Sequence, residues 1–462
     1  MSNASVAPSA RQLLALAWPI IVSRSAQTVI SVSDAAMVAP LGEDAIAATT
    51  AGALNVLLLF TLPMGAMFII SSFASQLYGR GDHGGARRYG YYGLVFSLLL
   101  ELLYIGLLAF APSVIEMLGY SPAVTTLMVE YSKPRLVGGG AAIALEALGN
   151  YYGGIGNTRL PMMTQVLCMI FNVGLNWVLI YGHLGAPALG VQGAALASTI
   201  STFIGLSVLF GCFLYGVGAD PSARTNRGSL RLSEFYRMLR FGIPTGLNWF
   251  VEFSAFMLFV NVVLIGLGTT TLAAFMAAMQ INQVSFMPAF GLTSAGAILV
   301  GQSIGAKEWD AVPKTVRLTA FATCAWQGSV AVLYILFAKY IMLPFSPPGA
   351  EGAAFLEIGA RVLVLSATWQ VADALSMSFA EALRAAGDTS FTAWTRTLIA
   401  WLLFVPGSYV SVRVLGGGIG WAVFWLSAYL GVLALVLWLR FRSGVWKTLD
   451  LTGQEPWLSD CK

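Results

Sequence analysis

The chain has 462 residues, of which 57% are hydrophobic and only 10% are charged, and its formal net charge is +4. A soluble domain carries about 25% charged residues because water must solvate its whole surface, so this composition excludes a soluble globular protein. The basic residues form no continuous stripe, which excludes a nucleic-acid partner, and the four cysteines have no metal-ligand spacing.

Twelve apolar runs follow one another along the chain. They lie at about 13–38, 46–73, 91–115, 124–150, 161–182 and 191–215, and then at about 238–266, 270–302, 317–341, 357–383, 391–412 and 418–440. The first run is expected to stay in the membrane, because residues 1–10 lack the basic region and cleavage pattern of a signal peptide. Only helices and closed barrels satisfy every backbone polar group in lipid, so runs of this length predict an all-α integral membrane protein with twelve transmembrane helices.

The distribution of Lys and Arg between the loops predicts the orientation. If the N-terminus is cytoplasmic, most of the 25 basic residues fall on the cytoplasmic side. The polar segment 216–240 contributes Arg224, Arg227, Arg231, Arg237 and Arg240 to that side, and Arg384 and Arg396 are assigned to it as well. We therefore expect a multi-pass protein of the bacterial inner membrane with both termini in the cytoplasm.

The two halves of the chain repeat one another. Pro244 stands 225 residues after Pro19. The segment SQLYGRGD (75–82) corresponds to GQSIGAKE (301–308), and the Gly-Asn-Thr turn at 156–158 corresponds to Gly-Asp-Thr at 387–389. Because each half contains six crossings, both halves start on the same side of the membrane, as in parallel repeats. This predicts two six-helix bundles related by a pseudo-two-fold axis along the membrane normal. The predicted boundaries are 1–215 for the first bundle, 216–240 for a cytoplasmic linker, 241–440 for the second bundle and 441–462 for a cytoplasmic tail.

The order of these motifs resembles the multidrug and toxic compound extrusion (MATE) family across nearly the whole chain. The resemblance is carried by LAWP (16–19), SDAAMVAPLG (33–42), GNTRLPM (156–162), FNVGLNWVLIYG (171–182), GVQGAALAS (190–198) and ALRAAGDT (382–389), together with the repeated pair above. It implies secondary active export of organic, often cationic, compounds by alternating access, driven by inward Na⁺ or H⁺.

Two further segments resemble the NorM-type branch of that family, which has acidic residues in helices seven and ten. They are FVEFSAF (250–256), which contains Glu252, and ADAL (372–375), which contains Asp373. Two positions depart from the family pattern. Arg24 stands mid-helix where a small or neutral polar residue is expected, and Asn176 stands where one branch carries an aspartate.

Acidic residues inside the apolar runs are the first candidates for function, because a charge at bilayer depth costs about 2.5–3.5 kcal/mol. The six candidates are Asp34, Glu101, Glu146, Glu252, Asp373 and Glu381. Glu146 and Glu381 occupy equivalent repeat positions near helix ends and are expected to form helix-end or salt-bridge contacts. Glu101 is a candidate partner that would neutralise Arg24, although no spacing decides this.

Asp34 is the strongest of these candidates. Gln27, Ser31 and Asp34 share one face of a helix, and Asn172 and Asn176 lie one helical turn apart on another. Together, Asp34, Asn172 and Asn176 are predicted to form an oxygen-rich pocket for a proton or Na⁺. The alternative is a polar network that only holds helices together.

Glu252 and Asp373 are predicted to form a second cation- or proton-binding site. Two carboxylates that are desolvated near each other do not both stay ionised cheaply, so such a pair suits one cation or one proton. The alternative is two unrelated acidic residues that line a pore.

The predicted substrate cavity is apolar and adaptable, because Met side chains are flexible and aromatic faces attract cations. Its predicted lining consists of Gln27, Met64, Met67, Phe68, Met279, Phe286 and Met287, and the predicted hinges are Pro19, Pro63 and Pro288. Packing against lipid is the alternative for each of the apolar residues.

The leading function is therefore a Na⁺- or H⁺-coupled antiporter that exports organic cations. The alternative is a flippase for lipid-linked precursors, which would require a basic cavity. An enzyme is not expected, because no Ser/His/Asp or metal-ligand grouping is present, and a channel is not expected, because no filter sequence repeats. We expect small organic molecules and membrane lipid as partners, a monomer, no cofactor and no metal beyond a possible Na⁺.

Overall fold

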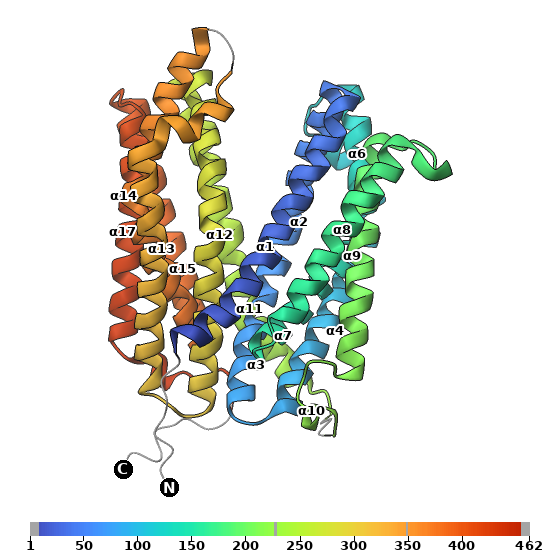
Figure 1. Cartoon of the computed structure of the whole chain (residues 1–462), viewed down its shortest axis with the longest axis vertical. Helices are drawn as coiled ribbons and strands as arrows, with labels where there is room; N and C mark the ends of the chain where they lie inside the picture. The colour runs from blue at the N-terminus through green and yellow to red at the C-terminus, as the bar shows by residue number, and fades with distance from the viewer. Residues whose placement is uncertain (1–8, 226–228, 348–349, 454–462) are drawn as a thin grey trace. The chain divides into compact units, whose positions relative to one another are not determined.

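The computed structural model describes residues 9–225, 229–347 and 350–453 (Figure 1). Within these residues the chain is helical and has no strand, and eleven helical stretches are long and apolar enough to cross a membrane. The remaining predicted crossing is interrupted at Gly138 into α6 (Pro122–Val137) and α7 (Gly139–Gly154), and each of these 16-residue helices is too short to span a bilayer alone. The all-α, twelve-helix prediction is confirmed.

The described residues form two compact units, of which one comprises Pro19–Gly246. Its elements are most of α1 (Ala10–Val38), η1 (Ala39–Leu41), α2 (Glu43–Met67), α3 (Ile69–Gly79), α4 (His83–Leu107), α5 (Ala111–Glu116), α6, α7, α8 (Arg159–Tyr181), η2 (His183–Gly185), α9 (Gly190–Tyr215), α10 (Ser222–Thr225) and the first half of α11 (Leu232–Leu258). Within this unit α8 packs along α9, and α4 packs along α7.

The other unit comprises the described residues from Leu247 onward, together with residues 9–18. Its further elements are η3 (Phe259–Val263), η4 (Leu264–Leu267), α12 (Thr269–Gly305), α13 (Ala311–Met342), η5 (Leu343–Phe345), α14 (Ala350–Ala386), α15 (Thr389–Ile399), η6 (Ala400–Phe404), α16 (Val405–Tyr409), η7 (Val410–Val414), α17 (Ile419–Arg442) and η8 (Val445–Thr448). Helix α14 packs against α12, α13 and α17, and a core that includes Phe259, Phe275, Leu363 and Leu433 lies among these helices.

The chain passes from one unit to the other at two places, and each lies beside a proline. The change from one unit to the other falls between Trp18 and Pro19 in α1, and between Gly246 and Leu247, just after Pro244, in α11. Residues 9–18 and 241–246 therefore belong to other units than the boundaries predicted from the sequence assign, and α11 begins inside the segment 216–240. A proline removes one backbone hydrogen bond, so a continuous helix changes direction most easily there.

The third crossing begins earlier than its apolar run, which starts near residue 91. Helix α4 begins at His83, and the Asp82 carboxylate caps it by accepting a hydrogen bond from the backbone N–H of Gly85 at 2.7 Å. The basic residues of its first turns are paired within the unit. Arg87 donates to the carbonyls of Phe213 and Leu214 at the end of α9, at 2.8 and 2.9 Å. Because the Arg87 guanidinium is hydrogen-bonded within the unit, the polar first turns can belong to this membrane helix.

The sequence repeat reappears as a repeated backbone turn after α3 and after α12. Gly81 and Lys307 occupy aligned positions and both have positive φ, at 81° and 63°. The following residues, Asp82 and Glu308, donate their backbone N–H groups to Leu77 and Ser303 at 2.9 and 2.8 Å. Lys307 thus adopts a left-handed conformation that glycine adopts without steric cost in the other half.

Candidate functional site

Asp34 lies at the centre of a buried polar cluster made by three helices of the Pro19–Gly246 unit. The Asp34 side chain belongs to α1 and is 8% exposed. Asn176 of α8 donates from Nδ2 to Asp34 Oδ1 at 2.5 Å, and Ser198 of α9 donates from Oγ to Asp34 Oδ2 at 2.9 Å. Both carboxylate oxygens are therefore held by neutral donors, and no ion pair with Asp34 is present in the described part of the chain.

Asn172 completes this cluster one turn before Asn176. Its Nδ2 donates to Ser198 Oγ at 3.0 Å, and its Oδ1 accepts from Asn176 Nδ2 at 3.3 Å. Both asparagines have no exposed surface, and Asn176 Oδ1 has no hydrogen-bond partner among the described residues. The structure thus brings Asp34, Asn172 and Asn176 together as predicted and adds Ser198. An unpartnered buried amide oxygen beside a carboxylate offers ligand atoms to a small hard cation.

Glu252 of α11 is the centre of a second polar cluster, in the unit that comprises the described residues from Leu247 onward. Its carboxylate accepts hydrogen bonds from Arg396 Nη1 of α15 and from the hydroxyl of Tyr429 of α17, each at 3.0 Å. Asp373 of α14 is near enough for its charge to interact with both Glu252 and Arg396. The two predicted carboxylates therefore share one environment, and that environment also contains a guanidinium.

Arg396 differs from its assignment on the sequence. Counting basic residues placed it among the cytoplasmic charges, whereas in the structure it lies inside the apolar stretch Thr389–Val414 with its side chain only 17% exposed. The reason is its tertiary partner: Glu252 compensates the charge, so the guanidinium remains within the helical bundle. Loop-by-loop charge counting does not detect such a pair.

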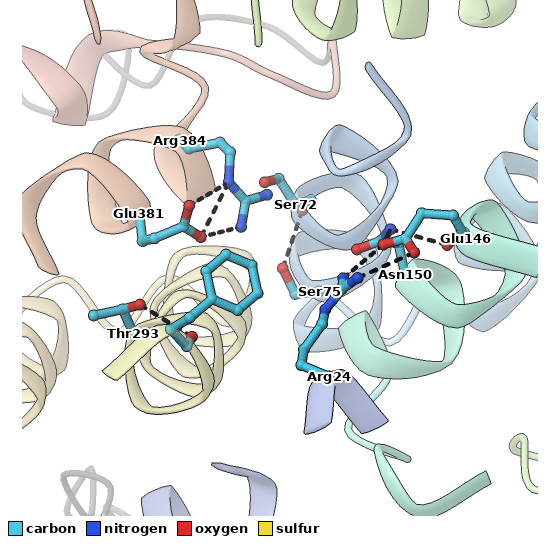
Figure 2. Close-up of polar contacts among 9 residues, drawn as sticks. Arg24, Ser72, Ser75, Glu146, Asn150, Thr293, Glu381 and Arg384 are labelled. Carbon is cyan, nitrogen blue, oxygen red and sulfur yellow. Dashed lines mark hydrogen bonds and ion pairs between the residues drawn. The ribbon is translucent and has the colours of Figure 1, made fainter. Parts of the chain in front are cut away.

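Arg24 pairs with Glu146, not with Glu101 as the sequence had suggested (Figure 2). Arg24 Nη2 donates to Glu146 Oε1 at 2.7 Å, and Asn150 Nδ2 donates to the same oxygen at 3.1 Å. Glu101 instead accepts a hydrogen bond from the backbone N–H of Gly140 at 2.6 Å. Arg24 and Glu146 therefore neutralise each other, which confirms the structural interpretation of Glu146.

Glu381, the repeat equivalent of Glu146, is also in an ion pair. Its partner is Arg384, three residues later in α14, and Figure 2 shows the carboxylate and the guanidinium side by side. The salt-bridge prediction for Glu381 is confirmed. Neither Glu146 nor Glu381 is then an unpaired charge that a substrate or ion must neutralise.

The predicted cavity residues are placed as follows. Gln27 accepts from Arg24 Nη1 at 3.2 Å, so its side chain belongs to the Arg24 cluster, and it forms no hydrogen bond with Asp34 in the described structure. Met67 has no exposed surface and Phe68 is buried, with Arg24 over its ring at 5.3 Å. The other four, Met64, Met279, Phe286 and Met287, are half-buried. Their role as a substrate lining stays a prediction.

The predicted hinge prolines all lie inside helices. Pro19 is in α1, Pro63 in α2 and Pro288 in α12. After Pro63 the helix is interrupted at Phe68, between α2 and α3, whereas α1 and α12 continue through their prolines. A hinge function for the three stays a prediction.

Ser198, Arg396 and Tyr429 are the polar partners that sequence reasoning missed. Ser198 was visible as the last residue of GVQGAALAS, but a serine in a membrane helix is too common to stand out. Tyr429 lies in an apolar run with other aromatic residues, and nothing in its spacing points to Glu252, 177 positions earlier. Contacts of such sequence separation are visible only in the fold.

A twelve-helix membrane protein with carboxylates inside the apolar helices of both halves has the architecture of a multi-pass membrane transporter. The comparison with known families makes this specific: the MatE family model matches residues 19–178 and again residues 244–410. The chain therefore belongs to the MatE family. The two matches begin at Pro19 and Pro244, the same pair that reveals the repeat.

The chain is also similar along its length to curated bacterial proteins. It is 28% identical over 442 residues to the probable multidrug resistance protein NorM of Bradyrhizobium diazoefficiens, which covers 93% of this chain and 92% of that protein. It is 25% identical to the multidrug resistance protein NorM of Vibrio cholerae, with 94% of each chain covered.

Solved structures show the same fold. A multidrug resistance MATE family transporter of the MOP superfamily in an outward-facing conformation has a TM-score of 0.83 at 22% identity, covering 95% of this chain and 96% of its own. A MATE protein in complex with MaL6 has a TM-score of 0.85 at 21% identity, covering 95% of this chain and 97% of its own.

Proposed function

We propose that this protein exports small organic, predominantly cationic compounds across a bacterial inner membrane in exchange for inward Na⁺ or H⁺. The names of the NorM relatives support multidrug efflux and do not favour a flippase. The half-buried Met64, Met279, Phe286 and Met287 are suited to varied apolar substrates, since thioethers and aromatic rings adapt to different shapes.

The observation that supports ion coupling best is the cluster around Asp34. A carboxylate at membrane depth is held by Asn176 and Ser198, and no positive charge is paired with it in the described residues. A bound proton or Na⁺ would supply the missing charge, and Asn176 Oδ1 would supply a further ligand atom. We assign Asp34, Asn172 and Asn176, with Ser198, to one coupling site.

Glu252, Arg396 and Asp373 form the second coupling site in this proposal. When ionised, the three groups together carry one net negative charge, since Arg396 compensates one of the two carboxylates. Binding of one cation or one proton would neutralise the remainder. Such binding drives the change between outward- and inward-facing states only by the difference in affinity between those states.

The experiment is efflux of a fluorescent organic cation from proteoliposomes under an imposed Na⁺ gradient or an imposed pH gradient. We expect Glu252→Gln and Asp373→Asn each to reduce gradient-driven efflux at least about tenfold. The double variant should be little worse than either, because groups that contact a shared partner are non-additive. The control is Asp310→Asn, which removes an exposed carboxylate before α13 and should leave efflux unchanged.

The thermal midpoint of each variant in detergent separates lost coupling from lost folding. Two independent losses that multiply in the double variant would refute a shared site. Efflux that is independent of both gradients in the unaltered protein would refute ion-coupled antiport itself.

A further inference from the structure

A cavity of about 550 Å³ lies within the Pro19–Gly246 unit, apart from the carboxylate clusters described above. This volume is in the range of about 300–1,000 Å³ that is typical of small-molecule sites. Its walls include the apolar side chains Leu108, Val137 and Leu196, together with the polar side chains Lys133, Gln192 and Thr199. The mixture of an apolar wall and a few polar groups is what an amphiphile requires.

Three helices of the unit contribute to the wall of the cavity. Leu108 immediately follows α4, Gln192 lies two residues after the start of α9, and Lys133 lies four residues before the end of α6. Lys133 is eleven residues after Pro122, or about 16 Å along the helix at 1.5 Å per residue. A lysine at such a position keeps its stem against apolar surface and directs its ammonium toward the nearer head groups.

Two of the polar groups in the cavity wall have no partner in the described chain. The exposed Lys133 ammonium forms no ion pair or hydrogen bond there, and the half-buried side-chain amide of Gln192 forms no hydrogen bond there. Thr199 is different, because its hydroxyl donates to the carbonyl of Pro134 at 2.9 Å. A cationic donor and a neutral donor thus remain available to a ligand.

We propose that this cavity binds an anionic phospholipid from the surrounding leaflet. The phosphate is held by Lys133 and Gln192, and an acyl chain packs on Leu108, Val137 and Leu196. The charge is complementary to an anionic head group, and a basic residue near the membrane surface contributes about 1 kcal/mol to such binding. A water-soluble phosphate would leave the apolar wall unoccupied, so the lipid is the occupant that uses the whole site.

The cavity also adjoins the Asp34 cluster through the chain. Thr199 in the cavity wall directly follows Ser198, which donates to Asp34. A lipid that fixes this part of α9 therefore holds one ligand of the coupling site. This step rests on the proposed ion-coupled function, whereas lipid binding itself does not.

Native mass spectrometry of the full chain, titrated with phosphatidylglycerol or with phosphatidylethanolamine, tests lipid binding without any transport assay. We expect the anionic lipid to bind more tightly. Lys133→Gln should weaken its binding about fivefold and remove the preference over the zwitterionic lipid. Lys133→Arg should retain the preference, and Leu196→Trp should reduce binding of both lipids by filling the cavity.

The matched control is Lys339→Gln, which removes another exposed lysine of a membrane helix, α13, that does not line the cavity. Equal binding of phosphatidylglycerol by Lys133→Gln and Lys339→Gln would overturn the proposal. So would competition by glycerol phosphate at the same concentration as the lipid, because that would show a head-group site without an acyl chain. Efflux from liposomes with and without phosphatidylglycerol then tests the link to Asp34 separately.

Discussion

At the scale of single residues, the candidate sites show which polar groups a sequence reveals. Asp34, Asn172 and Asn176 were predicted together, because a carboxylate and a pair of amides at helical spacing are costly inside a membrane. The structure joins them by hydrogen bonds of 2.5 and 3.3 Å. Residue spacing did not predict the contribution of the third helix, α9. Its Ser198 lies 164 positions after Asp34, and no sequence pattern connects the two residues.

The Asp34 cluster leads to a prediction about two variants. Asp34→Asn should leave the protein folded and abolish export driven by the imposed gradient, because the neutral amide no longer exchanges a proton or attracts a cation. Ser198→Ala should retain export but change its dependence on ion concentration, because a hydrogen bond to a charged group contributes about 1.5–3 kcal/mol. Proteoliposome efflux at several concentrations of H⁺ and Na⁺ measures both. Unchanged gradient-driven export by Asp34→Asn at matched protein content would reduce the cluster to a structural network.

Arg396 and Glu101 show why charge patterns along a sequence are insufficient. The sequence pattern assigns Arg396 to the loop charges, whereas in the fold it pairs with Glu252. The same pattern makes Glu101 a candidate partner of Arg24, whereas Glu101 accepts a hydrogen bond from Gly140. A one-dimensional count records how many charges lie on each segment but not which helices adjoin. The ion pair of Glu381 is easier to predict, because Arg384 lies one helical turn away in the same helix. The partner of Glu146 is Arg24 in another helix, 122 positions earlier, and only the fold shows that contact.

At the scale of helices, α4 supplies hydrogen-bond partners to backbone groups of two neighbouring helices. Glu101 accepts from Gly140 N–H at the start of α7, just beyond the break at Gly138. One turn later in α4, the hydroxyl of Tyr104 donates to the carbonyl of Leu59, four residues before Pro63, at 3.3 Å. A proline leaves the carbonyl four residues before it without its helical hydrogen-bond donor. One helix thus satisfies a backbone group beside a helix break and another that a proline leaves free.

The close approach of α4 and α7 predicts that Gly140 does not tolerate a side chain. A Cβ at Gly140 would lie 2.5 Å from Glu101 Cβ and 2.6 Å from the carbonyl oxygen of Ser97. Gly140→Ala should therefore destabilise the protein by about 1–3 kcal/mol, since the two helices must separate. The measurement is the thermal midpoint in detergent.

The control for Gly140 is Gly174→Ala in α8, where a Cβ would meet nothing within 4 Å. Alanine is favoured over glycine in a helix by about 1 kcal/mol, so this variant should be neutral or stabilising. If Gly140→Ala is as stable as Gly174→Ala, the support of α7 by α4 is not a tight contact.

At the scale of the whole molecule, hydrophobic runs and the repeat predicted the fold because both reflect strong constraints. Lipid requires every backbone group to be paired, which limits the chain to helices, and the doubled motifs place equivalent turns at Gly81 and Lys307. The division into units was less visible. It falls at Pro19 and after Pro244, inside continuous helices, and no change of composition marks it.

The orientation of the chain in the membrane is the remaining prediction, and it concerns the molecule as a whole. Because the arginine-rich segment 216–240 is expected in the cytoplasm, Ser443 beyond α17 should be cytoplasmic, and Leu184 between α8 and α9 should lie on the opposite side. Leu184 is 84% exposed and Ser443 is also exposed, so a thiol at either position is accessible to a reagent on its own side. In a background with Ser at all four cysteines, Leu184→Cys should react with a membrane-impermeant maleimide in intact cells. Ser443→Cys should react only after lysis, and the reverse pattern would invert the assigned topology and with it the direction of transport.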